Sequence, residues 1–151
     1  MITTRPATPA DLPVLLQFEQ GIITAERPFD PTLKPDPISY YDIGAMIVDP
    51  EVEVIVAVDG DLIVGSGYAK EKPSDLYVDP PKHCFLGFMF VRPEYRGRGV
   101  NGLVTDALLD WARARGLTEV QLRVYDDNFG AIRAYEKKGF SKYMVVMRRE
   151  I

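Results

Sequence analysis

One segment constrains the fold more than any other, because it changes from a strand pattern to a helix pattern across a short glycine-rich turn. The apolar run 84–91 predicts a strand, and Pro93 ends it because proline cannot donate to a strand ladder. The turn that follows is Arg96-Gly97-Arg98-Gly99-Val100-Asn101-Gly102. A helix N-terminus leaves backbone N–H groups unpaired and carries positive partial charge, and glycines let an anion approach closely. The segment therefore predicts a phosphate site at a strand-to-helix junction.

The remaining pattern indicates a mixed α/β chain. Valines at alternate positions of 52–58, followed by Asp59-Gly60-Asp61, are typical of a strand entering a hairpin. Later segments alternate between strand and helix, which favours a parallel strand pair. Proline-rich loops are expected at 28–37 and 72–82. We expect strands at 2–5, 52–58, 62–70, 84–91, 120–125 and 140–148, and four helices, at 8–23, 39–47, 101–115 and 128–139.

Length and composition bound the function classes. The 151 residues fit one domain, 1–151, and no apolar run approaches the roughly 20 residues of a membrane helix. A net charge of -4 argues against nucleic-acid binding and mildly favours a cationic acceptor such as an amine. The start of the chain lacks a signal-peptide pattern, and the lone Cys84 excludes an intrachain disulfide. We therefore expect a cytoplasmic protein that does not bind a membrane.

The turn resembles motif A of the GNAT family of N-acetyltransferases. In that motif Gln or Arg is followed, after two residues, by Gly and, after one more, by Gly or Ala. Arg96, Gly99 and Asn101 take these positions, and Asn101 departs from the usual small residue. The opening 2–12 is similar to the family's first strand and helix start, and 128–140 to its motif B. The resemblance implies a GNAT-like fold, with a central, mostly antiparallel sheet and a splayed parallel pair.

The resemblance also implies where the acyl donor, acetyl-CoA, binds. Its pyrophosphate is expected on the turn, its pantetheine arm along Met89, Phe90 and Val91, and a further contact at Asn128, which also suits a helix N-cap. The full set of expected donor-binding residues is Met89, Phe90, Val91, Arg96, Gly97, Arg98, Gly99, Val100, Asn101, Gly102, Asn128 and Tyr135.

By the same resemblance Tyr135 lies near the thioester sulfur and acts as general acid, while a core-packing aromatic is the plainer interpretation. The general base is open, because the strand 120–125, where some members carry a glutamate, has none and places Arg123 there. Glu26, His83 and Tyr68 are candidate bases, and proton removal through ordered water is an alternative. Cys84 is interpreted as a small buried hydrophobe. The resemblance implies no metal.

Three matters stay open at the level of sequence. A non-catalytic acyl-CoA sensor on the same fold is the main alternative, because fold does not guarantee chemistry. A nucleotide-binding protein of another kind is the second, although the turn lacks the Gly-Lys-Ser/Thr ending of a P-loop and the Rossmann spacing. The acceptor is a small-molecule or peptide amine of unspecified identity, and a homodimer is common in the family.

Overall fold

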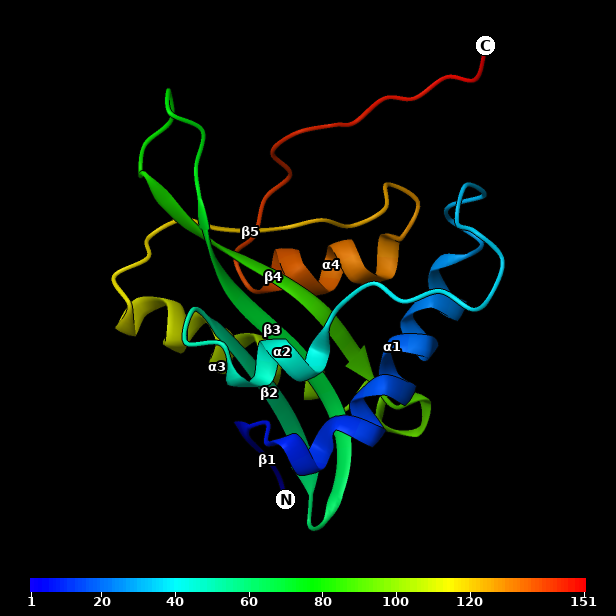
Figure 1. Cartoon of the computed structure of the whole chain (residues 1–151), viewed down its shortest axis with the longest axis vertical. Coiled ribbons are helices and arrows are strands. Elements are labelled where there is room, and N and C mark those ends of the chain that lie inside the picture. The colour runs from blue at the N-terminus through cyan, green and yellow to red at the C-terminus, as the bar shows by residue number, and fades with distance from the viewer.

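The centre of the molecule is a five-stranded sheet. The computed structural model describes all 151 residues and orders the strands β1-β2-β3-β4-β5. Pairing is antiparallel from β1 to β4 and parallel between β4 and β5. The predicted mixed sheet with one parallel pair is therefore confirmed (Figure 1). The strands are β1 Ile2–Pro6, β2 Val52–Asp59, β3 Leu62–Pro73, β4 Lys82–Val91 and β5 Val120–Leu122.

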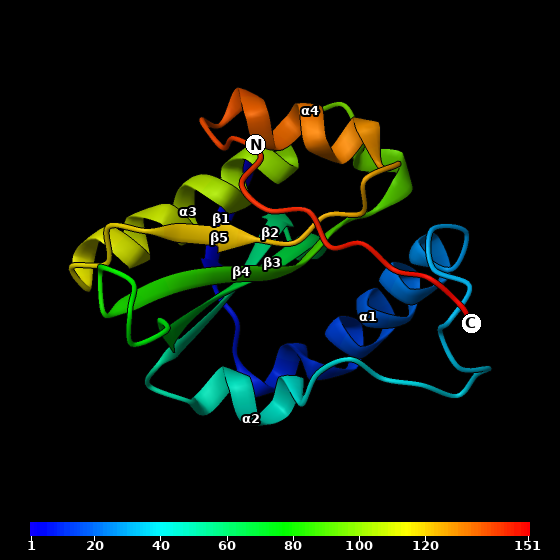
Figure 2. The same cartoon turned by 90° about the horizontal axis from the view of Figure 1, so that it is seen from above.

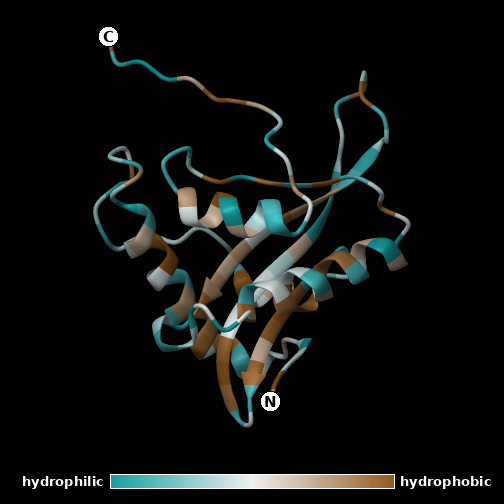
Figure 3. Ribbon diagram, turned by 180° about the vertical axis from the view of Figure 1, so that it is seen from behind, coloured by the Kyte–Doolittle hydropathy of each residue, from teal (hydrophilic) through white to brown (hydrophobic).

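Four helices cover the two faces of this sheet. They are α1 Leu12–Glu26, α2 Ile43–Val48, α3 Val100–Ala114 and α4 Phe129–Lys137. Seen from above, α1 and α2 lie on one side of the sheet, and α3 and α4 on the other (Figure 2). Each face has its own apolar core, one built around Leu15 and Phe18 of α1 and the other around Val104 and Leu108 of α3. Figure 3 shows the hydrophobic strands enclosed between these layers. None of the helices combines the length and the apolar character that a bilayer crossing requires.

Local hydrogen bonds define several element boundaries. Asp11 ends a one-turn helix before α1, accepts from the Thr8 backbone N–H at 2.8 Å, and pairs with Arg5 at 2.8 Å. Asp42 caps α2 by accepting from the Ala45 N–H at 3.1 Å, so this helix begins at Ile43 and not at the predicted residue 39. Glycines with positive φ follow α3 and α4, as expected for helix ends that need a left-handed residue. Local hydrogen bonding is thus legible in the sequence at these points.

Three glycines permit close packing beside β4. A side chain on Gly87 would meet the Tyr68 ring at 2.6 Å, and one on Gly67 would meet the Met89 sulfur at the same distance. A side chain on Gly65 would meet Val100 at 2.8 Å. These three positions therefore require glycine, and Gly87 allows the Tyr68 ring to approach β4 closely.

The predicted C-terminal strand at 140–148 is wrong. Residues 141–151 join no strand, and every one of them is exposed. Tyr143, Met144, Val145, Val146 and Met147 are between 74 and 90% exposed. The segment leaves the end of α4 and extends away from the body (Figure 1). The composition of this segment gives it strand propensity, but a strand forms only when it pairs with another strand. The segment does not pair with β5, whose outer edge is left free.

Candidate active site

The sheet opens into a fork between β4 and β5. The two strands pair only from Cys84 to Leu86 of β4, opposite Val120 to Leu122 of β5. Beyond Leu86, β4 continues to Val91 with β3 on one side and no strand on the other. Met89, Phe90 and Val91 lie in this unpaired stretch, as expected for a segment that binds an extended ligand by main-chain hydrogen bonds.

A bulge in β4 creates the fork. Phe88 has a φ of 57°, the only positive value outside glycine, and the β3–β4 register shifts between Ser66 and Tyr68. The Ser66 hydroxyl donates to the Phe88 carbonyl at 3.1 Å, which holds the bulge from the β3 side. Such an outlier costs on the order of 1–3 kcal/mol and is retained where the surrounding structure enforces it. The sequence carried no signal for Phe88, because an apolar residue in an apolar run looks like regular strand.

The glycine-rich turn lies just beyond the fork and presents a row of free donors. Gly97 and Gly99 have φ of 75° and 78°, and Gly99 is the N-cap of α3. None of the backbone N–H groups of 97–102 donates to an acceptor within the chain. Backbone N–H groups need acceptors, so this concave row suits an anion.

Side chains around the turn add to this character. Arg96 and Arg98 take part in no ion pair, and Arg98 stacks on the Tyr95 ring at 4.5 Å. The Tyr95 hydroxyl donates to Asp59 at 2.7 Å and anchors the turn to the end of β2. The amide oxygen of Asn101 is buried without a hydrogen-bond partner. The turn therefore holds positive charge and unsatisfied polar groups together.

Helix α4 carries Tyr135 and Asn128. Burial, and secondarily the nearby Glu26 carboxylate, raises the pKa of Tyr135 to about 12, so its phenol is protonated at neutral pH. Its ring packs edge-on against Phe140 at 5.9 Å. Asn128 is the N-cap of α4 and accepts from the Ala131 N–H at 3.3 Å. The capping role of Asn128 is thus present in the structure.

Glu26, the last residue of α1, is close enough to Tyr40, Tyr125 and Tyr135 to raise the pKa of each. Burial raises the pKa of Glu26; the neighbouring Tyr40 hydroxyl lowers it, and Asp30 raises it. The Tyr40–Glu26 contact is looser than a normal hydrogen bond, because the buried Tyr40 hydroxyl has no partner of standard geometry. Burial also raises the pKa of Tyr125, to about 12. The structure therefore brings one candidate base and the candidate acid into one electrostatic neighbourhood.

A clasp joins the loop after α1 to the loop before α4. The Tyr125 hydroxyl donates to Asp30 at 2.9 Å, and the Phe29 ring stacks on the Tyr125 ring at 5.9 Å. Figure 2 shows these two connections on the same side of the molecule. The clasp thus ties the loop that follows Glu26 to the loop that precedes the helix carrying Tyr135, and periodicity gave no sign of it.

Two other residues lie elsewhere. His83 is near the start of β4, where its Nδ1 is 3.0 Å from the Ser74 hydroxyl, and it is not brought together with Tyr135. Cys84 is fully buried, and burial raises its thiol pKa to about 11. Its interpretation as a small buried hydrophobe is confirmed. Glu19 accepts from the backbone N–H groups of Tyr40 and Tyr41, both at 2.9 Å, and so positions them.

Comparison with known proteins decides the family. Residues 20–140 match the model of the acetyltransferase (GNAT) family. The chain belongs to the GNAT family. Among curated GNAT relatives, it is 31% identical over 93 residues to N-alpha-acetyltransferase 30 of Schizosaccharomyces pombe, covering 62% of this chain and 60% of that protein. The chain thus spans less than two thirds of that relative's length.

Solved structures show the same GNAT fold. The tetramutant of the BH1408 protein from Bacillus halodurans matches with a TM-score of 0.86 at 19% identity, covering 98% of this chain and 99% of that one. A predicted acetyltransferase from Clostridium acetobutylicum, solved with acetyl-CoA, matches with a TM-score of 0.72 at 16% identity, covering 99% and 96%. At these identities the likeness supports the fold of this GNAT chain alone.

Proposed function

We propose that this GNAT chain transfers an acetyl group from acetyl-CoA to a primary amine by direct attack in a ternary complex. The observation that carries the proposal is the unpaired end of β4 leading into six consecutive N–H groups without acceptors. An extended arm ending in a pyrophosphate has the shape and charge for this combination. A structural neighbour was solved with acetyl-CoA, which supports the choice of donor.

The residues present fit the donor. Residues 96–102 bind the pyrophosphate through backbone N–H groups and the two arginines, and the orphaned Asn101 amide oxygen lies beside them. Met89, Phe90 and Val91 pair with the pantetheine arm in place of a strand. Asn128 adds a contact from the start of α4. Acetyl-CoA supplies the acyl group as an activated thioester.

We assign the acid–base roles to Glu26 and Tyr135, because the Glu26 carboxylate is close enough to raise the pKa of Tyr135. Glu26 is the general base and takes the proton that the ammonium form of the acceptor must lose, directly or through water. Tyr135 is the general acid and gives its proton to the leaving sulfur. Burial of Cys84 supports direct transfer, because a thiol with a pKa of about 11 is a poor nucleophile at neutral pH.

The test is a measurement of thiol release. Acetyl-CoA is incubated with the protein and a panel of amines, and free CoA is titrated with a thiol reagent. Amine-dependent CoA release supports the enzyme. Tight acetyl-CoA binding by calorimetry without release under any amine supports the alternative, a non-catalytic sensor, and the absence of binding contradicts both.

We also propose a homodimer in which the C-terminal segment of one copy pairs with the free edge of β5 in the other. Five adjacent large side chains at 143–147 are exposed, and an apolar strand with no partner is prone to pair with another edge. The outer edge of β5 is such an edge. The single-domain organisation 1–151 and the cytoplasmic compartment stay predictions.

A further inference from the structure

Three cationic side chains share the sheet face that α1 and α2 cover. On β3, Tyr68, Lys70 and Lys72 are alternate residues and pair with Gly87, Phe85 and His83 of β4. Tyr68 packs in the core beneath α1 and α2, so the two lysines continue the same face beyond it. Arg123 follows β5 two residues after Gln121, which pairs with Phe85. These three cations, Lys70, Lys72 and Arg123, are called the cationic cluster below.

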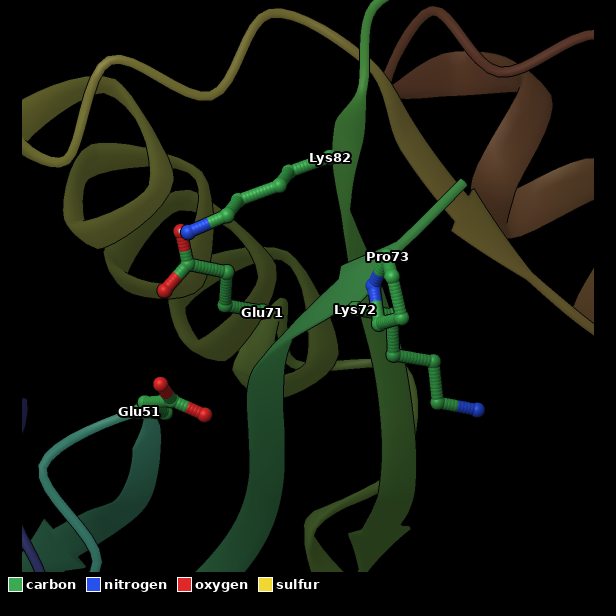
Figure 4. Close-up of a pocket in the computed structure, with 5 residues that line it drawn as sticks. All are labelled: Glu51, Glu71, Lys72, Pro73 and Lys82. Atoms are coloured by element: carbon green, nitrogen blue, oxygen red, sulfur yellow. The ribbon is translucent and has the colours of Figure 1, made fainter. Parts of the chain in front are cut away.

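The cationic cluster has no acidic partner. The six ion pairs of the chain include none of its members. On the opposite face of the same strands, Glu71 pairs with both Arg115 at 2.9 Å and Lys82 at 3.5 Å. Figure 4 shows the Lys72 side chain extending away from Glu71, Lys82 and Glu51. The charges on one face of these strands are thus paired, whereas Lys70, Lys72 and Arg123 on the other face have no ion-pair partner.

Lys72 is held in this arrangement at a cost. Its ammonium lies 4.1 Å from the centre of the Phe85 ring, which fixes the side chain along the sheet face. Burial of the ammonium, followed by repulsion from Lys70 and Arg123, lowers the pKa of Lys72. Like charges that approach one another without a counter-charge are relieved when an anion binds between them.

The cluster lies close to the fork. Phe85 precedes Gly87 by two residues of β4, or roughly 7 Å along a strand. Arg123 comes directly after Leu122, the last β5 residue paired to β4. Arg123 is also close enough to the Tyr68 hydroxyl to influence it, and Tyr68 packs against Gly87. An acceptor with its amine at the fork therefore reaches the cluster within the length of a small molecule.

We propose that the acceptor is an amine bearing an anionic oxygen group, a carboxylate or a phosphate, which Lys72 and Arg123 bind on the α1–α2 face. The inference rests on the proposed acetyl transfer and names its substrate class. The net charge of -4 alone would favour a cationic acceptor. The acceptor, however, meets the local positive charge of the cationic cluster, and the negative charges lie elsewhere on the chain.

The experiment compares matched amines that differ in one anionic group: amino acids against their amides, and glucosamine against glucosamine 6-phosphate. We expect kcat/KM to be roughly tenfold or more higher for the anionic member of the preferred pair. Lys72→Met, which keeps the apolar stem over Phe85, and Arg123→Gln should each raise KM for that member roughly tenfold and leave the neutral member unchanged. Lys82→Met, which removes a cation from the other face of the same hairpin, is the matched control.

A second readout separates this inference from the proposed function. Binding of the same amines is measured by thermal shift and calorimetry without any acyl donor. Anion-dependent binding that Lys72→Met and Arg123→Gln abolish supports the acceptor site even if no thiol is released, in which case only the proposed transfer fails. Equal turnover of charged and neutral amines, or binding that neither variant alters, overturns the inference.

Discussion

Tyr135 lies on the α4 face that packs against Phe140, and its hydroxyl is the one polar atom of that ring. Because its pKa is about 12, the hydroxyl carries a proton for delivery at neutral pH. We expect Tyr135→Phe to lower kcat by about 10²-fold and to leave KM for acetyl-CoA nearly unchanged, since the ring remains. Steady-state kinetics measures both. Tyr77→Phe, an exposed tyrosine on the β3–β4 loop, is the control, and an unchanged kcat in Tyr135→Phe removes the acid assignment.

Glu26 gives the pH dependence. A general base must be deprotonated, and burial raises the pKa of Glu26 above its usual range. Activity should therefore fall as pH decreases through this raised pKa and be retained above it. We expect Glu26→Gln to abolish this limb of the kcat/KM profile and to lower kcat by about 10²–10³-fold.

A matched control for Glu26 lies on the other face of the sheet. Glu53 of β2 is also partly buried, and burial raises its pKa. It pairs with Ala69, which packs in the core beneath α3, away from the fork. Glu53→Gln should keep the acidic limb, and a Glu26→Gln profile identical to that of the parent protein would favour proton removal through water alone.

The turn before α3 acts as an element, and Gly99 tests it. Its φ of 78° strains any residue with a Cβ, although nothing lies within 4 Å of where that atom would be. We expect Gly99→Ala to cost about 1 kcal/mol of unfolding free energy and to raise KM for acetyl-CoA about tenfold, because the N–H row shifts. Thermal denaturation and donor kinetics measure the two effects.

Gly60 separates strain from donor binding. It has a φ of 61° in the β2–β3 hairpin, also with open space around it. Gly60→Ala should therefore cost a similar unfolding free energy with no change in KM. Gly99→Asn, which tolerates the left-handed region, should recover most of the loss. Equal effects of Gly60→Ala and Gly99→Ala on KM would contradict a direct role for the turn.

At this scale the sequence predicted features set by neighbouring residues better than those set by distant ones. The cap at Asn128 and the stops at Gly116 and Gly139 are local, so hydrogen bonding within a few residues decides them. The bulge at Phe88 depends on Ser66, a residue on another strand, and no local pattern encodes it. The turn could be predicted because the backbone conformation of this turn requires glycine.

The site was readable only in part. The turn was predicted from its glycines and its place before a helix, Tyr135 was reached by resemblance, and Glu26 was one candidate among several. The loop after Glu26 is held to the loop before α4 by the clasp between Asp30 and Tyr125, which are separated by most of the chain. The cationic cluster arises from strand register, which pairs Lys72 with His83 and Gln121 with Phe85. Strand register is a tertiary property that composition does not encode. Composition gave only the net negative charge, which suggested a cationic acceptor.

For the whole molecule, the exposed C-terminal segment gives the clearest prediction. Light scattering should give the mass of two chains for the full protein, and the mass of one chain after deletion of residues 141–151. The reason is that the deletion removes the apolar segment that pairs with the β5 edge of the other copy. Paired Val145→Glu and Val146→Glu substitutions should have the same effect if the deletion variant aggregates, whereas Arg149→Ala should remain dimeric.

A monomeric chain would contradict exchange between copies, and protection of the segment in that monomer would show that it folds back onto its own β5. That outcome would restore the strand predicted at 140–148. Amide hydrogen exchange would then show protection of 143–147 that is independent of protein concentration.

The fork between β4 and β5 separates two groups of residues whose sequences can change independently of each other. The proposed donor contacts come from the end of β4, the turn and α4, whereas the proposed acceptor contacts come from the end of α1, the following loop and the ends of β3 and β5. Substitutions at Lys72 or in the α1–α2 loop should therefore change which amine is accepted without changing the binding of the acyl donor. To engineer a new acceptor specificity, residues on the acceptor side of the fork should be mutated and those on the donor side kept.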